Sequence, residues 1–556
     1  MKTMSTLDYA VFIAYCLIII GVGLYLSFRN KKKEKTSEDY FLAGKSLTWW
    51  AIGASLIASN ISAEQFIGMS GSGFALGIAI SSYEWMAAIT LILVGKFLLP
   101  IFIKKQIYTM PQFLEQRYNS NVKTTMAIFW IGVYIFVNLT SVLYLGSLAI
   151  ETVMGVERIY AIIGLALFAM IYSIFGGLTA VAWTDVIQVI FLIAGGLATT
   201  YLALDAVSEG SGPIVGFQTL MDAVPDRFDS ILSKDHPFYG DLPGWGVIIG
   251  GMWIANISYW GLNQYITQRA LAAKSLKEAQ KGVMFAGYLK LLMPLIVVLP
   301  GIAAYYLLMK EGAADLASMS VTNDVLSGLP DSSVTKSMTD GATMTIKSDK
   351  AYPVLLQFLP TGFKGIAFAA LAAAIVSSLA SMANSTATIF TMDIYKPLIN
   401  SGASETKLVT VGRLTALVAF GLAILVAPML GKLDQAFQYI QEYTGFVTPG
   451  IVAIFLLGIF WKKTTPKAAL VGGVSTFLFS ILFKQFLEEV PFIDRMGYVF
   501  LICTALMIAV SLFDGKGADS KKAIIMKDFD FKTSRSFNAG AIALCIILTV
   551  LYILFQ

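Results

Sequence analysis

The polar residues that interrupt long apolar stretches are those whose chemistry says most about this sequence. Residues 59–65 carry five polar side chains among seven, inside a stretch that is otherwise apolar. A helix that breaks there would free backbone carbonyl groups, and such groups can bind a cation where irregular backbone lines a cavity within a membrane. The alternative is a helix that ends near the membrane interface. The polarity of the run favours the broken helix.

A carboxylate and an ammonium group also stand in apolar surroundings, Glu84 directly after Tyr83 and Lys290 between two leucines. A charge at membrane depth costs roughly 2.5–3.5 kcal/mol on insertion scales, so each charge needs a reason to be there. In one reading the two residues are partners. In the other, Glu84 lies at the interface and Lys290 extends its long side chain towards it. The sequence leaves both readings open.

Amide and aromatic side chains share one predicted helical face. Asn256, Tyr259 and Asn263 are spaced by three, four and seven positions, as on one side of a helix. Phe437 and Gln441 repeat the combination four positions apart. This pairing suits a sugar, because amides hydrogen-bond hydroxyl groups and the apolar face of a pyranose stacks on a ring. The alternative is hydrogen bonding between helices.

Residues 370–381 are mostly small, and the adjacent Ser377 and Ser378 stand among them. Small residues permit close packing of helices, which is the simpler interpretation. Paired hydroxyl groups could also complete an oxygen cage around a hard cation such as sodium, together with carbonyl groups of the broken helix. Asp185, near the start of another apolar run, either attracts cations at the inner mouth or caps a helix.

These residues must be positioned by helices that cross a membrane. Of the 556 residues, 57% are hydrophobic and 13% are charged, about half the charge of a soluble protein. Stretches of about 20 apolar residues are long enough to span a bilayer. Hydropathy therefore predicts an all-α polytopic membrane protein with about fourteen transmembrane helices. The predicted spans are 7–27, 48–73, 77–103, 124–150, 158–176, 180–205, 245–264, 280–308, 362–394, 407–429, 433–460, 467–487, 495–513 and 536–555.

Charge in the connecting loops predicts the orientation. Lys and Arg are concentrated in alternate loops, which favours a cytoplasmic position for these loops and places both chain ends outside. The first span lacks the polarity of a cleavable signal peptide, and we expect a retained anchor. Loops 206–243 and 309–351 are long and polar, and could be helical lids or flexible segments. The basic loops are 28–36, 104–123, 265–281, 396–407, 461–467 and 514–535.

Several classes of function find no support in the composition. Cys16, Cys503 and Cys545 lie in apolar stretches without a CxxC spacing, and the single histidine, His236, lies in a polar loop. A disulfide framework, a transition-metal site and an intramembrane enzyme are therefore not expected. Nucleic-acid binding is not expected either, because no basic surface with interleaved aromatic residues occurs outside the loops. No signalling domain is recognised after residue 513, which counts against a membrane sensor.

Three motifs carry a resemblance to a known family. Residues 39–44 read Asp-Tyr-Phe-Leu-Ala-Gly, residues 176–185 read Gly-Gly-Leu-Thr-Ala-Val-Ala-Trp-Thr-Asp, and residues 460–465 read Phe-Trp-Lys-Lys-Thr-Thr. They resemble the solute:sodium symporter family, and within it the bacterial carriers of galactose and glucose, over nearly the whole chain. The resemblance implies one membrane transport domain with two inverted five-helix repeats of the leucine-transporter type, each beginning with a broken helix. The implied division of residues 1–556 is an extra helix at 7–27, repeats at 48–205 and 245–460, and extra C-terminal helices at 467–555.

The same resemblance implies roles for individual residues. Asp185 would lie near the path by which sodium leaves. Ala87 replaces a serine that contacts sugar in relatives, and Ala380 replaces a hydroxyl residue of members that carry two sodium ions, which favours one sodium per cycle. The implied sugar-binding residues are Gln65, Glu84, Asn256, Tyr259, Lys290 and Gln441, the gate residues are Met69, Tyr83 and Phe437, and the sodium ligands are the carbonyl groups of Ala58, Ile61 and Ala374 with the hydroxyl groups of Ser377 and Ser378.

The predicted function is sodium-coupled import of a small sugar across the inner cell membrane by alternating access. Sodium is then a co-transported ion, and the expected partners are the sugar, sodium and the lipid bilayer. The main alternative is a sodium symporter of the same fold for an amino acid, a vitamin, a polyol or an anion. An anionic substrate would fit a pocket containing Glu84 poorly.

Overall fold

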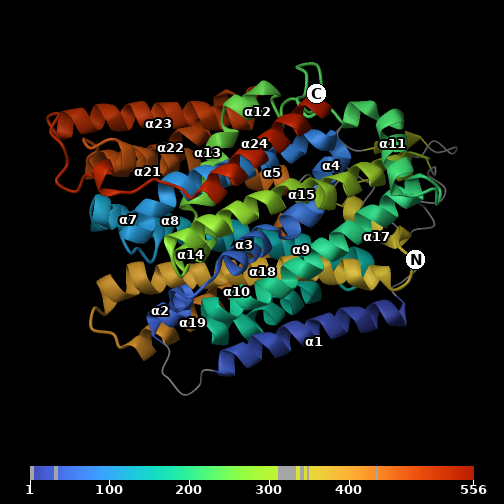
Figure 1. Cartoon of the computed structure of the whole chain (residues 1–556), viewed down its shortest axis with the longest axis horizontal. Coiled ribbons are helices and arrows are strands. Elements are labelled where there is room, and N and C mark those ends of the chain that lie inside the picture. Colours follow the sequence, from blue (N-terminus) through green and yellow to red (C-terminus); the bar gives the residue numbers. More distant parts are fainter. Residues whose placement is uncertain (1–4, 30–35, 311–333, 338–342, 347–349, 433–435) are drawn as a thin grey trace.

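The computed structural model describes residues 5–29, 36–310, 334–337, 343–346, 350–432 and 436–556. Over these residues the regular secondary structure is helical apart from two short antiparallel strands, β1 (Val334–Ser337) and β2 (Thr343–Ile346). The long helices form a bundle whose axis runs horizontally in Figure 1. Ten helices in the described part are long and apolar enough to cross a membrane, which confirms the predicted all-α polytopic class.

Successive helices often belong to one long segment that π-helical turns or kinks divide. The α-helices are α1 (Thr6–Arg29), α2 (Ser37–Leu42), α3 (Trp49–Asn60), α4 (Ser70–Leu76), α5 (Ser82–Leu93), α6 (Leu99–Lys104), α7 (Met110–Arg117), α8 (Ser120–Val133), α9 (Thr140–Met154), α10 (Arg158–Val207), α11 (Pro213–Ala223), α12 (Trp245–Ile249), α13 (Met252–Ile257), α14 (Gln264–Leu271), α15 (Leu276–Lys310), α17 (Ala351–Phe358), α18 (Phe363–Ile389), α19 (Glu405–Val426), α20 (Ala436–Thr444), α21 (Thr448–Phe460), α22 (Pro466–Phe486), α23 (Phe492–Asp514) and α24 (Arg535–Leu554). The π-helical segments are η2 (Glu64–Met69), η4 (Val94–Leu98), η5 (Tyr134–Leu139), η7 (Ser258–Leu262) and η10 (Phe390–Ile399).

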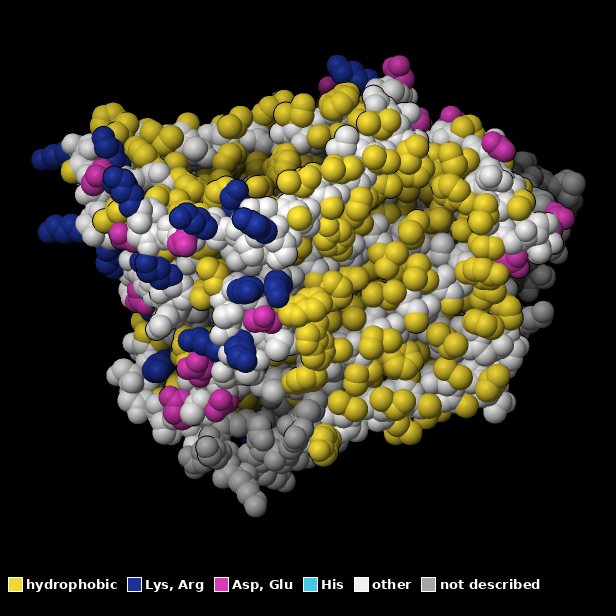
Figure 2. Space-filling view, in the orientation of Figure 1, with side chains coloured by type: hydrophobic (Ala, Val, Ile, Leu, Met, Phe, Trp, Pro, Cys, Tyr) yellow, Lys and Arg dark blue, Asp and Glu magenta, His cyan; other side chains and the backbone are white. Residues whose placement is uncertain are grey.

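The surface has the distribution of side chains that a bilayer requires. Figure 2 shows a broad hydrophobic surface on this face, with Lys and Arg gathered mainly at the end of the bundle opposite the chain termini marked in Figure 1. Large apolar side chains stay exposed along the outer helices, among them Leu17 on α1, Leu425 on α19 and Leu501 on α23. Such a band would be unstable in water, because each exposed apolar group loses the stabilisation of burial. The chain is therefore a multi-pass membrane protein.

The second predicted span is broken, as its polar residues indicate. Helix α3 ends at Asn60, Ile61 is extended (φ −75°, ψ 105°), and the chain becomes helical again at η2. The cause is local: the backbone N–H of Ser62 donates to Oε1 of Gln65 at 2.9 Å. In a continuous helix that N–H would bond to the carbonyl oxygen of Ala58. The break therefore releases a carbonyl group in the middle of the bundle.

The stretch at 245–264 is also interrupted. Helices α12 and α13 meet at Gly250 and Gly251, η7 follows, and Asn263 is extended (φ −87°, ψ 124°) before α14 begins. The single helical face predicted for Asn256, Tyr259 and Asn263 is therefore divided between α13, η7 and the extended residue that follows η7. The interruption agrees with the broken first helix expected for this repeat, and the π-helical turns change the number of residues per turn.

The predicted turn between the spans 158–176 and 180–205 lies at Gly177. Its dihedral angles (φ 63°, ψ −163°) interrupt α10, so this segment consists of two helices that meet at a sharp corner. A Cβ atom at this position would lie 2.5 Å from the carbonyl oxygen of Tyr40. Glycine is required here both for the positive φ angle and for the close approach of α2.

Two predicted basic loops are partly buried helices. The loop expected at 265–281 contains most of α14, in which Arg269 has no exposed surface. The loop expected at 104–123 contains α7, and its buried Arg117 donates hydrogen bonds to carbonyl groups near the end of α21, including that of Gly458 at 2.6 Å. The charge count placed both arginines in exposed loops. It cannot detect that a guanidinium group whose hydrogen bonds are all satisfied can be buried.

The remaining loop predictions have mixed outcomes. Loop 206–243 is partly helical, because it contains α11, and it packs against the bundle through Arg227, whose guanidinium group lies 4.1 Å from the ring centre of Tyr305. The described residues of loop 309–351 include β1 and β2, which neither reading of that loop anticipated. The predicted span 433–460 consists of two helices, α20 and α21. Most of the predicted loop 28–36, and residues 311–333, lie outside the described part.

Candidate functional site

One cavity collects the residues to which sugar binding and gating were ascribed. It lies between η2, α5, α13, η7, α15 and α20, so side chains far apart in the sequence meet at the two interrupted helices. Asn263 and Ala87 also line it. The predicted residues on its wall are Gln65, Met69, Tyr83, Glu84, Asn256, Tyr259, Lys290, Phe437 and Gln441.

Glu84 and Lys290 are partners. The ammonium group of Lys290 donates hydrogen bonds to Oε2 of Glu84 and to Oδ1 of Asn60. It also lies 5.0 Å from the ring centre of Trp260. The side chains of Glu84 and Lys290 are 4% and 1% exposed, which excludes the reading that placed both at the interface. The pair therefore presents a hydrogen-bond acceptor and a donor to the cavity with little net charge.

A chain of hydrogen bonds continues from this pair to a group of tyrosines. Nδ2 of Asn60 donates to the hydroxyl group of Tyr259 at 2.9 Å. The hydroxyl group of Tyr265 donates to the same oxygen, and the ring of Tyr265 contacts that of Tyr134 edge to face at 5.6 Å. Asn60 therefore links the ion pair to an aromatic layer on the α14 side of the cavity.

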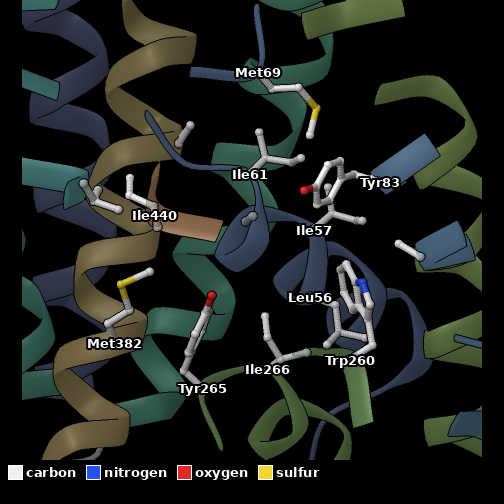
Figure 3. Packing of buried hydrophobic residues seen from close by; sticks show 14 of the residues in the cluster. Leu56, Ile57, Ile61, Met69, Tyr83, Trp260, Tyr265, Ile266, Met382 and Ile440 are labelled. Carbon is white, nitrogen blue, oxygen red and sulfur yellow. The ribbon is translucent and has the colours of Figure 1, made fainter. Parts of the chain in front are cut away.

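The predicted gate residues close another side of the cavity. The rings of Tyr83 and Phe437 lie edge to face with centres 5.3 Å apart, and Met69 is almost completely buried beside the cavity. Gly68 permits this contact, because a Cβ atom there would lie 2.8 Å from Cβ of Phe437. Figure 3 shows Met69 above Ile61, which follows the end of α3, Tyr83 to its right and Tyr265 below it.

Two of the amide side chains are already engaged within their own segments. Oε1 of Gln65 accepts hydrogen bonds from the backbone N–H and the hydroxyl group of Ser62, at 2.9 and 3.0 Å. Nδ2 of Asn256 donates to the carbonyl oxygen of Met252 at 3.1 Å. These bonds hold both side chains at the cavity wall. A ligand would meet pre-oriented amides, which lowers the entropic cost of binding.

Of the predicted cation ligands, Ser378 on α18 contacts the end of α3. The hydroxyl group of Ser378 lies 3.0 Å from the carbonyl oxygen of Ser59 and 3.5 Å from that of Ile61. Ala374 lies one helical turn before Ser378 on α18, and Ala58 lies two residues before the end of α3. All of these residues are buried.

Asp185 adjoins this group from α10. It has no exposed surface and accepts hydrogen bonds from the hydroxyl groups of Ser377, at 2.5 Å, and Ser55. It lies eight residues after the corner at Gly177, inside a helix, so the helix-cap interpretation was wrong. Because Ser377 directs its hydrogen atom towards Asp185, the lone pairs of its oxygen remain available to a cation.

Sequence reasoning missed several residues of this region. Asn60 and Glu64 lie in the polar run and line the cavity, but no separate role was ascribed to them. Oε1 of Glu64 accepts a hydrogen bond from Ser141 at 2.6 Å. Arg269 reaches Asp185 from α14, at 3.9 Å. Tyr265 was missed as well, and Arg269 stands four positions after it on α14, on the same helical face.

Comparison with known proteins places these features in context. The sequence profile of the sodium:solute symporter family matches residues 40–475. A sodium/glucose cotransporter of Vibrio parahaemolyticus is 56% identical over 99% of this chain and 98% of its own length. A sodium/myo-inositol cotransporter 2 of Mus musculus is 34% identical over 89% of this chain and 72% of its own length. Sodium/glucose cotransporter 1 of Ovis aries is 32% identical over 85% of this chain and 71% of its own length.

The fold has a counterpart among solved structures. The substrate-bound, outward-open structure of a Na+-coupled sialic acid symporter matches with a TM-score of 0.77 and 23% sequence identity. The match covers 93% of this chain and 99% of the other. At this identity the similarity concerns the arrangement of the helices.

Proposed function

The chain belongs to the sodium:solute symporter family, and from this premise we propose that it imports a small sugar of the glucose or galactose kind together with sodium. It is a sodium-coupled symporter, with sodium as a co-transported ion. Its relatives are transporters, and moving a solute in this way requires no covalent chemistry.

One observation carries the choice of a sugar: the Lys290–Glu84 pair lies on a cavity wall that also holds amide groups and aromatic rings. A neutral polyhydroxy molecule can donate to a carboxylate and accept from an ammonium group at the same time, while its apolar face lies against a ring. An anion would find no unpaired positive charge on this wall, because Glu84 neutralises Lys290. The proposed sugar ligands are Gln65, Glu84, Asn256, Tyr259, Lys290 and Gln441, and the proposed gate residues are Met69, Tyr83 and Phe437.

The proposed arrangement has fourteen spans with both termini outside, in the inner cell membrane. Residues 48–205 and 245–460 form the two inverted repeats, and the segments 7–27 and 467–555 add outer helices. The interruptions at Ile61 and Asn263 support the repeats, because each lies in the first span of its half. The gathering of basic side chains at one end of the bundle supports the orientation.

The proposed sodium site uses the carbonyl groups of Ala58, Ile61 and Ala374 and the hydroxyl groups of Ser377 and Ser378. The contacts of Ser378 with the end of α3 support it, because one ion there could join α3 to α18. Asp185 lies beside the site and would receive the ion on its way to the cytoplasm.

Transport then follows from the affinities of two conformations. Sodium between α3 and α18 braces the broken helix and favours the state that is open to the outside. Sugar enters, Met69, Tyr83 and Phe437 close behind it, and loss of sodium to the cytoplasm loosens the end of α3. Asn60 is attached to that end and bonds both Lys290 and Tyr259, so its movement disturbs the sugar ligands and the inner aromatic layer together.

A polyol is the second candidate, and a specific observation favours it. Among the relatives, a sodium/myo-inositol cotransporter is about as similar to this chain as a mammalian sodium/glucose cotransporter. A ring bearing hydroxyl groups on every carbon would use the same donors and acceptors. Ala87 also removes one hydroxyl contact from the cavity, which bears on the choice between such rings.

The test is uptake into proteoliposomes that contain the purified protein. Labelled glucose, galactose, myo-inositol and proline are offered separately, under equal inward gradients of sodium or potassium. We expect sodium, and not potassium, to drive accumulation of glucose or galactose above its equilibrium level. Accumulation of myo-inositol alone would select the second candidate. Sodium-driven uptake of proline without any sugar or polyol would refute the proposal.

A further inference from the structure

Arg269 is a fully buried cation beside the proposed sodium site, and the proposed function gives it no role. It lies on α14 and has no exposed surface. Its guanidinium group donates to the hydroxyl group of Ser55 at 3.3 Å, to that of Ser381, and to the backbone carbonyl oxygen of Tyr265. One of its terminal nitrogen atoms lies 3.9 Å from Oδ2 of Asp185.

Asp185 connects this arginine to the proposed sodium ligands. Oδ1 of Asp185 accepts from Ser377 at 2.5 Å, whereas Oδ2 faces Ser55 and Arg269. One hydroxyl group therefore separates a bound sodium ion from the carboxylate. The guanidinium group approaches the same carboxylate from the other side. In the described part of the chain, Asp185 is the carboxylate that both cations would share.

Two cations that share one buried carboxylate weaken each other's binding. Asp185 attracts sodium, and Arg269 both repels sodium and neutralises Asp185. At an effective dielectric constant near 20, two charges about 10 Å apart interact strongly enough to change a binding constant about tenfold. We propose that Arg269 is an internal counter-cation that competes with the transported sodium for Asp185, and so keeps sodium affinity low enough for release.

This inference rests on the proposed sodium site and adds a residue that tunes it without touching the ion. Low affinity matters because an ion held too tightly by Asp185 would stay bound on the side where sodium is scarce. Arg269 also holds the carbonyl group of Tyr265, whose hydroxyl group contacts Tyr259. A shift of Arg269 towards Asp185 when sodium leaves would therefore be transmitted to the inner aromatic layer.

A purely structural arginine would behave differently when replaced. Its loss would destabilise the protein and would leave sodium affinity unchanged or weaker. Arg117 provides the matched control, because it is equally buried but donates to the carbonyl groups of Gly458, Trp461 and Thr464, and not to Asp185. Only a competing cation predicts tighter sodium binding after its removal.

The experiment measures the sodium concentration for half-maximal sugar uptake, together with equilibrium binding of 22Na+ to the purified protein. For Arg269→Gln we expect this concentration to fall about tenfold or more, with slower turnover. The sodium concentration for half-maximal uptake by Arg269→Lys should stay near the parent value, because lysine retains the positive charge. Asp185→Asn should raise this sodium concentration, because Arg269 then repels sodium without an opposing carboxylate. In the double variant Arg269→Gln/Asp185→Asn both charges are absent, and the sodium concentration should return towards the parent value. Arg117→Gln should not lower it.

The outcomes separate this inference from the proposed function. Unchanged or weaker sodium binding in Arg269→Gln, while Ser378→Ala still raises the sodium requirement, overturns the counter-cation and leaves the sodium site standing. If Ser378→Ala has an unchanged sodium requirement, the proposed sodium site itself is refuted. If Arg269→Gln fails to fold, Asp185→Asn and the double variant decide: weakening in the first and recovery in the second support competition, and equal values in both refute it.

Discussion

Lys290 and Glu84 stand 206 positions apart in the sequence and form a buried ion pair on the wall of one cavity. Each side chain reaches the cavity from a different long helical segment, α15 and α5. Breaking a buried ion pair by removing one partner costs more than the pair contributes, because the other charge is left unpaired. The pair is thus both the strongest candidate for sugar recognition and a point of fragility.

We expect Lys290→Ala and Glu84→Ala to abolish detectable sugar binding and to lower the free energy of unfolding by about 3–5 kcal/mol. Gln441→Ala should weaken sugar binding with a smaller loss of stability, since it leaves no charge unpaired. Binding of labelled galactose and thermal unfolding in detergent measure the two effects. The control is Glu151→Ala, whose pair with Arg158 is about one-third exposed and contributes little. Normal transport by all three cavity variants would show that the pocket is wrongly placed.

Ser378→Ala should raise the sodium concentration for half-maximal uptake and should change sugar binding at saturating sodium much less. Ser377→Ala should raise that sodium concentration by a smaller factor. Ser378 contacts the end of α3, whereas Ser377 is held by Asp185. Since Ala380 offers no side-chain oxygen, the parent should have a Hill coefficient near one for sodium. Ser147→Ala is the control, because that buried hydroxyl group bonds within α9. A clearly sigmoidal parent curve contradicts the single ion.

Tyr259→Phe should slow sodium-driven uptake several-fold and affect sugar affinity less. The ring that would stack on the sugar remains, whereas the hydrogen bonds from Asn60 and Tyr265 are lost, each worth about 1 kcal/mol. Tyr259→Ala should impair both quantities, because the ring is lost as well. The maximal rate of uptake and the half-saturating sugar concentration, compared separately for each variant, distinguish the two effects. Uptake by Tyr259→Phe equal to that of the parent would exclude a role for the hydroxyl group, and equal losses in Tyr259→Phe and Tyr259→Ala would exclude a separate role for the ring.

Asp8→Ala should destabilise the protein by about 1–3 kcal/mol, although α1 is an outer helix. Oδ1 of Asp8 accepts from the backbone N–H groups of Gly362, at 2.7 Å, and Gly365, at 3.0 Å, at the start of α18. Without it, these groups are buried and unpaired. Thermal unfolding measures the effect, and Asp8→Asn, which keeps an acceptor, should lose less. Equal stability of Asp8→Ala and the parent would show that α18 does not depend on this cap.

Asp241→Asn should stabilise the protein at neutral pH. Burial, followed by the neighbouring Glu442, raises the pKa of Asp241 from 3.8 to about 6. The folded protein then binds a proton more tightly than the unfolded chain, so stability rises as pH falls from about 6 towards 4. Above pH 6 the charged form costs up to about 3 kcal/mol. Unfolding temperatures at pH 5 and 7.5 should differ less in Asp241→Asn. The exposed Asp229, replaced by Asn, should not alter that difference.

The interrupted helix and the membrane-spanning class could be predicted from the sequence, because a continuous helix facing lipid rarely tolerates five polar side chains among seven residues. Whether Glu84 and Lys290 are partners could not be predicted, since that depends on packing between α5 and α15. Arg269 was counted among loop charges, because a charge count does not reveal that Ser55, Ser381 and Tyr265 supply acceptors inside the bundle. Burial of charge depends on partners that are distant in sequence.

Gln65 has two tasks whose combination has a thermodynamic consequence. Its side chain lines the cavity, and its Oε1 also accepts the Ser62 N–H that would otherwise close the helix onto Ala58. A sugar hydroxyl group that binds Gln65 therefore changes the strength of the hydrogen bond between Gln65 and the Ser62 N–H. That bond holds open the break in the helix, which exposes the carbonyl groups for sodium. In a closed thermodynamic cycle the effect is reciprocal: the factor by which sodium tightens sugar binding must equal the factor by which sugar tightens sodium binding. Cooperativity between ion and sugar would thus pass through the short turn from Ser62 to Gln65.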